Sequence, residues 1–307
     1  MDEWIKQYNK YDCLQTYDGT GTLSHYCSAG NLIKILESKY FWAQDISTFD
    51  DPNEGIAVLD YLRNNLGTFF STEEERGLIQ DEINKVQSFA SCFVTCFCLD
   101  ENSQYMFDEF HNKNSSSIGC DCEIVFDGDA LVNSILFHDH QRNGEIIEKK
   151  NNYVKKKYIV YSDSQWKKII DYEIAALYPL LRKDGSVLNP QQAAEKLVRK
   201  LYFLGTYFKV PCKENSVSAK EKEVRFLADI YEQYVRLDDA AIEGGFVQAY
   251  TEGDRKVIHF HYDLVTILRI RTKNSDIYKK VKEELENAKI NQDVKEYLLK
   301  SLCIRAI

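Results

Sequence analysis

The stretch LSHYCSAGNLIKILESKYFWAQDISTFDDPNEG, residues 23–55, decides the expected fold. Its first five residues predict a short strand, Ser28 follows as a helix N-cap, and apolar side chains then recur at helical spacing. A second extended segment begins at Phe41, and an Asp-Pro-Asn turn closes the stretch. Because polar residues gather where each strand ends, we expect a functional site in this region.

The chain beyond this stretch continues to alternate between strand and helix patterns. Further strands are predicted at residues 89–98, 119–126, 155–161, 224–230, 256–260 and 264–270. Helices are predicted at residues 56–66, 72–86, 163–181, 190–208, 276–288 and 294–302. The pattern predicts an α+β protein with a mixed or antiparallel sheet flanked by helices. We expect one domain in two parts, residues 1–162 and 209–307, interrupted by a helical insertion at 163–208.

Composition excludes several classes of protein. The hydrophobic content of 44% is enough for a large core, and a net charge of -9 argues against a general nucleic-acid binder, which needs a basic face. No run approaches the ~18 apolar residues of a membrane span, and the first residues carry no apolar signal segment. Nine cysteines without such a signal indicate reduced thiols. We therefore expect a cytoplasmic protein with no membrane partner.

Residues 25–28, His-Tyr-Cys-Ser, are the first candidate site. A histidine at a strand edge can donate a hydrogen bond to a sugar hydroxyl, and the adjoining helix N-terminus favours an anionic ligand group. The alternative is a histidine satisfied in the core beside a serine that only caps the helix. Both interpretations remain open from the residues alone.

The turn at residues 49–55, FDDPNEG, is the second candidate. It is typical of a structural turn that also caps the following helix. Alternatively, Asp50, Asp51 and Glu54 hold a divalent cation, and the protein is a metal-dependent nuclease. No second carboxylate cluster or histidine pair in the sequence supports a metal, so we expect none.

Residues 221–226, EKEVRF, are the third candidate. On a strand, Glu221, Glu223 and Arg225 share one face. This face is either a solvated edge or a functional set, in which a carboxylate stabilises positive charge that develops on a sugar.

Cysteines form a fourth cluster on two predicted strands. Cys96 and Cys98 share a face of one strand, and Cys120 and Cys122 share a face of the next. Four thiolates on adjacent strands would suit zinc, but buried thiols that act as small apolar side chains are the favoured interpretation. The chain also lacks the common phosphate-loop, dinucleotide, zinc-protease and serine-hydrolase motifs.

Taken together, several stretches resemble the bacterial, phage-associated family called Domain of Unknown Function 2971. Its members carry a strand like L-Y-H-Y-T-S, a helix, and then a segment ending in F-N-D-P-x-E-G. LSHYCS and FWAQDISTFDDPNEG correspond, with Asp50 in place of the usual Asn. VTCFC, QYMF, IGCDCEIVF and KEKEVRFL follow in the family's order, with Cys98 where Ser is common and Phe107 where Trp is common. The resemblance covers most of the chain but excludes residues 163–208.

The order of these parts is also similar to that of ADP-ribosyltransferases, which implies a split sheet and NAD as the cofactor. Carried over by position, the similarity implies that His25 holds the nicotinamide ribose and that Tyr105 or Phe41 stacks on nicotinamide. Glu223 would then bind the ribose 2′-hydroxyl and stabilise the cation, and Glu221 would orient the acceptor. The expected cofactor-binding set also includes Tyr26, Ser28 and Arg225.

These implications predict an NAD-binding ADP-ribosyltransferase or NAD glycohydrolase, acting as a toxin or anti-phage effector on a protein or nucleic-acid acceptor. One alternative is a non-catalytic sensor or protein-binding module. Another is the metal-dependent nuclease. The transferase hypothesis requires His25 and Glu223 to line the same cleft.

Overall fold

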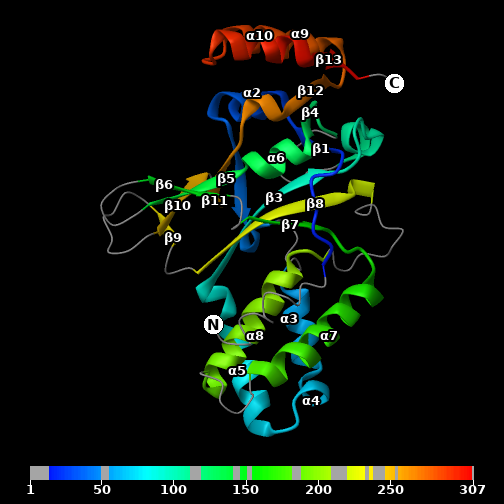
Figure 1. The fold of residues 1–307 in the computed structure, drawn as a ribbon. Helices are drawn as coiled ribbons and strands as arrows, with labels where there is room; N and C mark the ends of the chain where they lie inside the picture. The colour runs from blue at the N-terminus through cyan, green and yellow to red at the C-terminus, as the bar shows by residue number, and fades with distance from the viewer. Residues whose placement is uncertain are drawn as a thin grey trace.

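A mixed β-sheet separates two layers of helices in the computed structural model (Figure 1). The structure describes residues 14–49, 55–110, 119–140, 146–150, 154–181, 188–208, 220–231, 235–237, 246–252 and 255–305. Among the described strands, β9 with β10 and β12 with β13 pair in parallel, and the other strand pairs are antiparallel. The predicted α+β class with a mixed sheet flanked by helices is confirmed.

The strands agree with most of the predicted extended segments. They are β1 (Thr22–Cys27), β2 (Tyr40–Asp45), β3 (Ala90–Cys98), β4 (Cys122–Asp127), β5 (Leu136–His140), β6 (Ile146–Lys150), β7 (Val154–Tyr158), β8 (Glu223–Tyr231), β9 (Val235–Leu237), β10 (Phe246–Glu252), β11 (Arg255–His261), β12 (Ile267–Thr272) and β13 (Leu302–Ile304). The prediction missed β5, β6, β9, β10 and β13. Two of these, β9 and β13, have three residues each, too few for a periodic pattern.

The helices begin and end close to the predicted limits. They are α2 (Ala29–Ser38), α3 (Ala57–Asn64), α4 (Leu66–Phe69), α5 (Glu73–Phe89), α6 (Gly128–Ser134), α7 (Asp163–Leu181), α8 (Pro190–Gly205), α9 (Ser275–Asn287) and α10 (Gln292–Ser301), with a π-helix at Tyr105–Glu109. The predicted capping box before α5 is present, because Thr72 and Glu75 exchange backbone-to-side-chain hydrogen bonds. Pro190 occupies the first turn of α8 as expected. The short α6 was not predicted.

Two hydrophobic cores lie on opposite faces of the sheet. One core combines the sheet with α2, α6, α9 and α10, and the other combines it with α3, α5, α7 and α8. The central strand β3 contributes to both, since Phe93 and Phe97 face the first core while Cys92 and Val94 face the second. Figure 1 shows the first group of helices above the sheet and the second below it.

The predicted helical insertion packs within the second layer. α8 contacts α5 and α3 as well as α7, and its side chains share a core with strands β3 and β8. The pair α7 and α8 therefore completes a bundle that the N-terminal half of the chain begins. The division into residues 1–162, 163–208 and 209–307 stays a prediction.

Candidate functional site

The sheet splits beside the central strand β3. On its outer side β3 pairs with β8 over its whole length. On its other side it pairs with β2 only through Phe93 and Val94 and with β1 only through Cys98. Strands β1 and β2 thus diverge along residues 95–97 of β3, and among the described strands no partner fills that gap. The split expected from the resemblance to ADP-ribosyltransferases is present at this position.

His25 lies in the gap. Its Nδ1 is 3.2 Å from the carbonyl oxygen of Cys96, and its ring contacts Phe41 and Phe97 with centroids 4.9 and 5.8 Å away. Because a carbonyl only accepts, Nδ1 carries the proton and Nε2 is the acceptor. Burial among apolar rings lowers the pKa of His25 to about 4, although the bond to the Cys96 carbonyl opposes that shift. His25 is therefore neutral at physiological pH.

The Nε2 atom of His25 remains available to a ligand. It makes no hydrogen bond to any described residue. It is also absent from the set of polar atoms that are fully buried without a hydrogen-bond partner. The side chain lines a pocket of about 960 Å³. This volume is near the upper end of the roughly 300–1,000 Å³ typical of small-molecule sites.

Several segments build the pocket around His25. They are the end of β1 with the start of α2, the exposed face of α2, strand β2, residue 110, the segment that precedes β4, the start of β11 and the residues after α9. The lining side chains outside β1 include Asn31, Lys34, Glu37, Ser38, Tyr40, Phe41, Trp42, Gln44, Phe110, Asp121, Arg255 and Lys289. The pocket thus offers aromatic surfaces, polar groups and charges of both signs. Of the sequence candidates, His25, Tyr26, Ser28 and Phe41 line it.

The N-terminus of α2 is already capped at the pocket. Ser28 accepts a hydrogen bond from the Asn31 backbone N–H, as expected for an N-cap. The carboxylate of Asp121 accepts a second one from the Ala29 N–H at 3.1 Å. Because Asp121 already places a negative charge there, the expected anionic ligand group at this helix end is not supported by the geometry.

A π-helix shapes the opposite wall. Within Tyr105–Glu109 the chain widens, and the Phe110 N–H donates to the Tyr105 carbonyl at 2.8 Å. Gly119 then donates to the Phe110 carbonyl at 2.7 Å and has φ of +76°. A Cβ at Gly119 would lie 1.8 Å from the Phe107 carbonyl oxygen, so only glycine fits there.

Tyr105 does not line this pocket. Its ring packs against Phe110 with centroids 6.2 Å apart, and the Lys220 ammonium lies 5.4 Å from its centroid. Phe41 is the aromatic side chain that reaches His25, but it is 1% exposed. A stacking role for either ring stays a prediction.

Strand β8, which carries Glu223 and Arg225, lies apart from His25. Val224 and Phe226 of β8 belong to the first core, whereas Leu227 belongs to the second, so Glu223 and Arg225 face the α3–α8 layer. Figure 1 shows β8 between the two helical layers. His25, which touches Phe97 of the first core, is on the other face. The requirement that His25 and Glu223 line one cleft is therefore not met among the residues that form the described pocket.

Glu223 and Arg225 form a buried ion pair instead. Arg225 Nε donates to Glu223 Oε1 at 2.7 Å, and both side chains are almost fully buried. The Arg225 guanidinium also donates to the Thr206 carbonyl at the end of α8 and lies over the Phe49 ring. Glu221 precedes the strand and is half-buried. These contacts attach β8 to the second helical layer, so the predicted cofactor contact of Arg225 has no geometric support.

Tyr26 takes part in a separate polar network, and because successive strand residues alternate, it lies on the face of β1 opposite His25. Its hydroxyl is 2.8 Å from both the Asp100 carbonyl oxygen and Glu123 Oε1, and it accepts from the Ser103 N–H. Burial and the Glu123 charge raise the pKa of Tyr26 well above its usual range. Tyr26 contributes to the pocket wall, but its hydroxyl is committed to this network.

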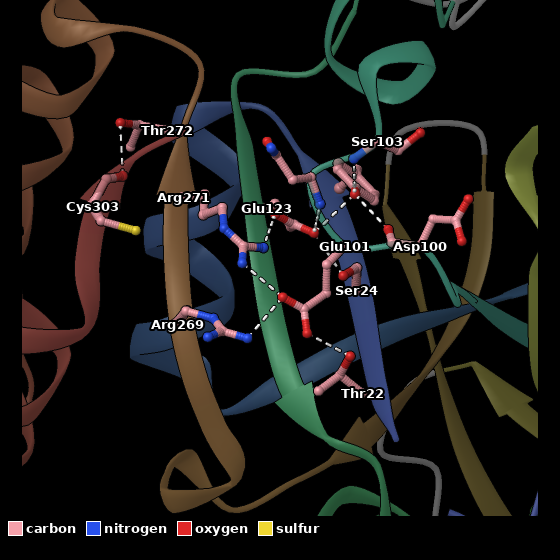
Figure 2. A network of polar contacts seen from close by, with 12 residues as sticks. Thr22, Ser24, Asp100, Glu101, Ser103, Glu123, Arg269, Arg271, Thr272 and Cys303 are labelled. Atoms are coloured by element: carbon pink, nitrogen blue, oxygen red, sulfur yellow. Dashed lines mark hydrogen bonds and ion pairs between the residues drawn. The ribbon is translucent and has the colours of Figure 1, made fainter. Parts of the chain in front are cut away.

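Glu123 is the centre of that network. It is fully buried and accepts from Ser24, from the Asn102 N–H and from Arg271 at 2.7–2.8 Å. Figure 2 shows Arg271 also reaching Glu101, which hydrogen bonds to Thr22 and pairs with Arg269. These donors hold the pKa of Glu101 below its usual value against the opposing effect of burial. The network binds the segment after β3 onto β1, β4 and β12, and the sequence prediction missed it. An acidic residue inside the apolar run GCDCEIVF was the available signal.

The cysteines do not form a metal site among the described residues. Cys122 faces the first core, whereas Cys96 packs against the second, so the sheet separates them. No group of three or more metal-ligating side chains occurs in the described part of the chain. The seven described cysteines form no disulfide with one another, and burial raises the pKa of Cys120 to about 12, so this thiol is protonated. The carboxylates Asp50, Asp51 and Glu54, on which the nuclease alternative rests, lie outside the described residues.

Comparison of the chain with protein-family models, with curated proteins and with solved structures found no match. The resemblance to Domain of Unknown Function 2971 therefore stays a prediction. Among the described helices, none combines the length and apolar character that a membrane crossing requires. The cytoplasmic location also stays a prediction.

Proposed function

We propose that this protein binds NAD or a related nucleotide in the pocket at the sheet split. The main support is the neutral side chain of His25. The hydrogen bond to the Cys96 carbonyl fixes its ring, and its Nε2 is left as an acceptor in a pocket of about 960 Å³. A ribose hydroxyl or an amide N–H would supply the matching donor. The volume accommodates a ligand of nucleotide size.

Transfer or hydrolysis at this pocket would need a carboxylate other than Glu223. The pocket carboxylates are Glu37 and Asp121, and either could stabilise an oxocarbenium-like state at a ribose. The activity proposed for testing is therefore NAD glycohydrolase or ADP-ribosyl transfer in which Glu223 plays a structural part. A role as a toxin or phage-defence effector, within the cytoplasm and on a macromolecular acceptor, belongs to the same proposal.

A non-catalytic NAD sensor is the second candidate. It is favoured by the position of Glu223, which is paired with Arg225 on the other face of the sheet, and by the low pKa of His25, which makes that side chain a weak base. A sensor would bind the nucleotide without consuming it.

The test measures NAD binding by calorimetry and nicotinamide release by chromatography. We expect wild type to bind NAD and His25→Leu to lose at least about tenfold in affinity, because an unmatched donor on the ligand costs on the order of 1–3 kcal/mol. Glu223→Gln should bind NAD as wild type does. If wild type releases nicotinamide and the release disappears in Asp121→Asn or in Glu37→Gln, the protein is an enzyme. If wild type binds NAD without releasing nicotinamide, it is a sensor.

Two results would contradict the proposal. If wild type neither binds NAD nor releases nicotinamide, nucleotide binding is wrong. If Glu223→Gln abolishes release while its folded state is retained, the assignment of a structural part to Glu223 is wrong. Circular dichroism and thermal unfolding of each variant provide the folding control.

A further inference from the structure

The pocket holds three cations without an anionic partner. Lys34, Arg255 and Lys289 line it, and within the described chain none of their side chains forms an ion pair or a hydrogen bond. The two pocket carboxylates, in contrast, are engaged by backbone groups. Glu37 accepts from the Lys289 N–H at 2.8 Å and Asp121 accepts from the Ala29 N–H. Because bonds from neutral backbone N–H groups leave both carboxylates charged, the lining carries three positive and two negative side chains and is net positive by one, in a chain whose net charge is -9.

The three cations come from separate elements that surround the same space. Lys34 lies on the pocket face of α2, where Asn31, Ile35 and Ser38 also line the pocket at helical spacing. Arg255 begins β11, whose pairing with β2 places Val257 opposite Gln44. Residue 289 follows α9 and is fixed beside α2 by its bond to Glu37. Three separate parts of the fold thus supply cations to one pocket, Lys34 and Lys289 as exposed side chains and Arg255 as a half-buried one.

We propose that the ligand of this pocket carries a phosphate or pyrophosphate group, which Lys34, Arg255 and Lys289 bind. The inference rests on the proposed function and specifies its ligand class. None of the three cations pairs with Glu37 or Asp121, and a pyrophosphate offers several negative charges and many acceptor oxygens with which all three could pair. Arginine and lysine bind such groups through charge-assisted hydrogen bonds. The phosphate site is thus formed by side chains, since Asp121 already occupies the helix N-terminus.

The test uses inorganic pyrophosphate and ADP-ribose as probes in calorimetry at one fixed salt concentration. Lys34→Ala combined with Lys289→Ala removes two of the cations. The matched control combines Lys168→Ala with Lys279→Ala, which are exposed helical lysines outside the pocket. We expect the pocket variant to lose at least about tenfold in affinity for both probes and the control to stay within about twofold of wild type.

Wild type that binds neither probe, or a pocket variant that binds both as wild type does, would overturn the inference. The phosphate site and the proposed NAD binding can fail independently in these experiments. If His25→Leu weakens NAD binding but the lysine substitutions do not weaken pyrophosphate binding, only the phosphate site is wrong. If the lysine substitutions weaken pyrophosphate binding and wild type does not bind NAD, NAD is the wrong ligand and the phosphate site is retained. The substitutions should leave folding intact, because Lys34, Lys168 and Lys279 are exposed helical positions where alanine is favoured and Lys289 is an exposed position after α9.

Discussion

At the scale of single residues, His25 has two separate tasks. Its Nδ1 donates its proton to the Cys96 carbonyl, on the side of β3 where no described strand pairs with residues 95–97, and its Nε2 is left as an acceptor at the pocket. Because its pKa is about 4, the ring keeps the same proton arrangement throughout the physiological range. Ligand recognition through His25 should therefore not depend on pH between about pH 5.5 and 8.

The low pKa of His25 makes the folded state sensitive to acid. The unfolded chain binds a proton at the ordinary histidine value of 6.5, whereas the folded chain binds it only near pH 4. Stability from this group is therefore fully present above pH 6.5 and is lost as the pH falls toward 4. Between pH 7 and pH 5 the loss should be about 2 kcal/mol.

Denaturant unfolding at both pH values measures this loss in wild type and in His25→Asn, which cannot titrate. The variant should be less stable at pH 7, because it loses the ring contacts of His25, but its own decrease between pH 7 and pH 5 should be smaller by about 2 kcal/mol. Equal decreases in the two proteins would show that the histidine is protonated in the folded state.

At the scale of elements, the π-helix and the residues after it fix one wall of the pocket. Gly119 is the position where this wall tolerates no side chain, because of its positive φ and the close Phe107 carbonyl. Gly77 in the exposed part of α5 is a contrasting glycine, since a Cβ there would meet nothing within 4 Å. The same substitution at the two sites should therefore have opposite effects.

Gly119→Ala should destabilise the protein by several kcal/mol, on the order of 2–4, and weaken ligand binding through displacement of Phe110. Gly77→Ala should stabilise it by about 0.5–1 kcal/mol through helix propensity and leave binding unchanged. Chemical denaturation and calorimetry with NAD measure both effects. If Gly119→Ala changes neither stability nor binding, the backbone between Phe107 and Gly119 follows a different path from the one described.

At the scale of the whole molecule, the sequence predicts local structure well and distant contacts poorly. His25, Ser28 and Phe41 come together because a strand, a helix and a strand adjacent in sequence form one side of the pocket. Arg255 and Lys289 reach the same pocket only through the pairing of β11 with β2 and the packing of α9, which no local pattern encodes. Alternation correctly predicts that Glu223 and Arg225 share a face, but it does not say which helical layer that face meets.

The second helical layer provides the test at this scale. Because α8 shares a core with α3, α5 and the sheet, removal of residues 163–208 would expose a large apolar surface. We expect a chain in which a short Gly/Ser linker replaces these residues to lose cooperative unfolding and to aggregate. A soluble, cooperatively unfolding deletion protein would instead identify an independent insertion. Size-exclusion chromatography and thermal unfolding distinguish the two outcomes.

The divergence of β1 and β2 also gives this sheet an edge in its interior. Exposed edges invite pairing with foreign strands, and proteins usually protect them with charges, bulges or covering segments. Here the ring of His25 covers one acceptor of the β3 edge, at Cys96. Loss of that ring would leave a backbone group open to an intruding strand, so substitution of His25 is expected to favour self-association as well as to weaken ligand binding.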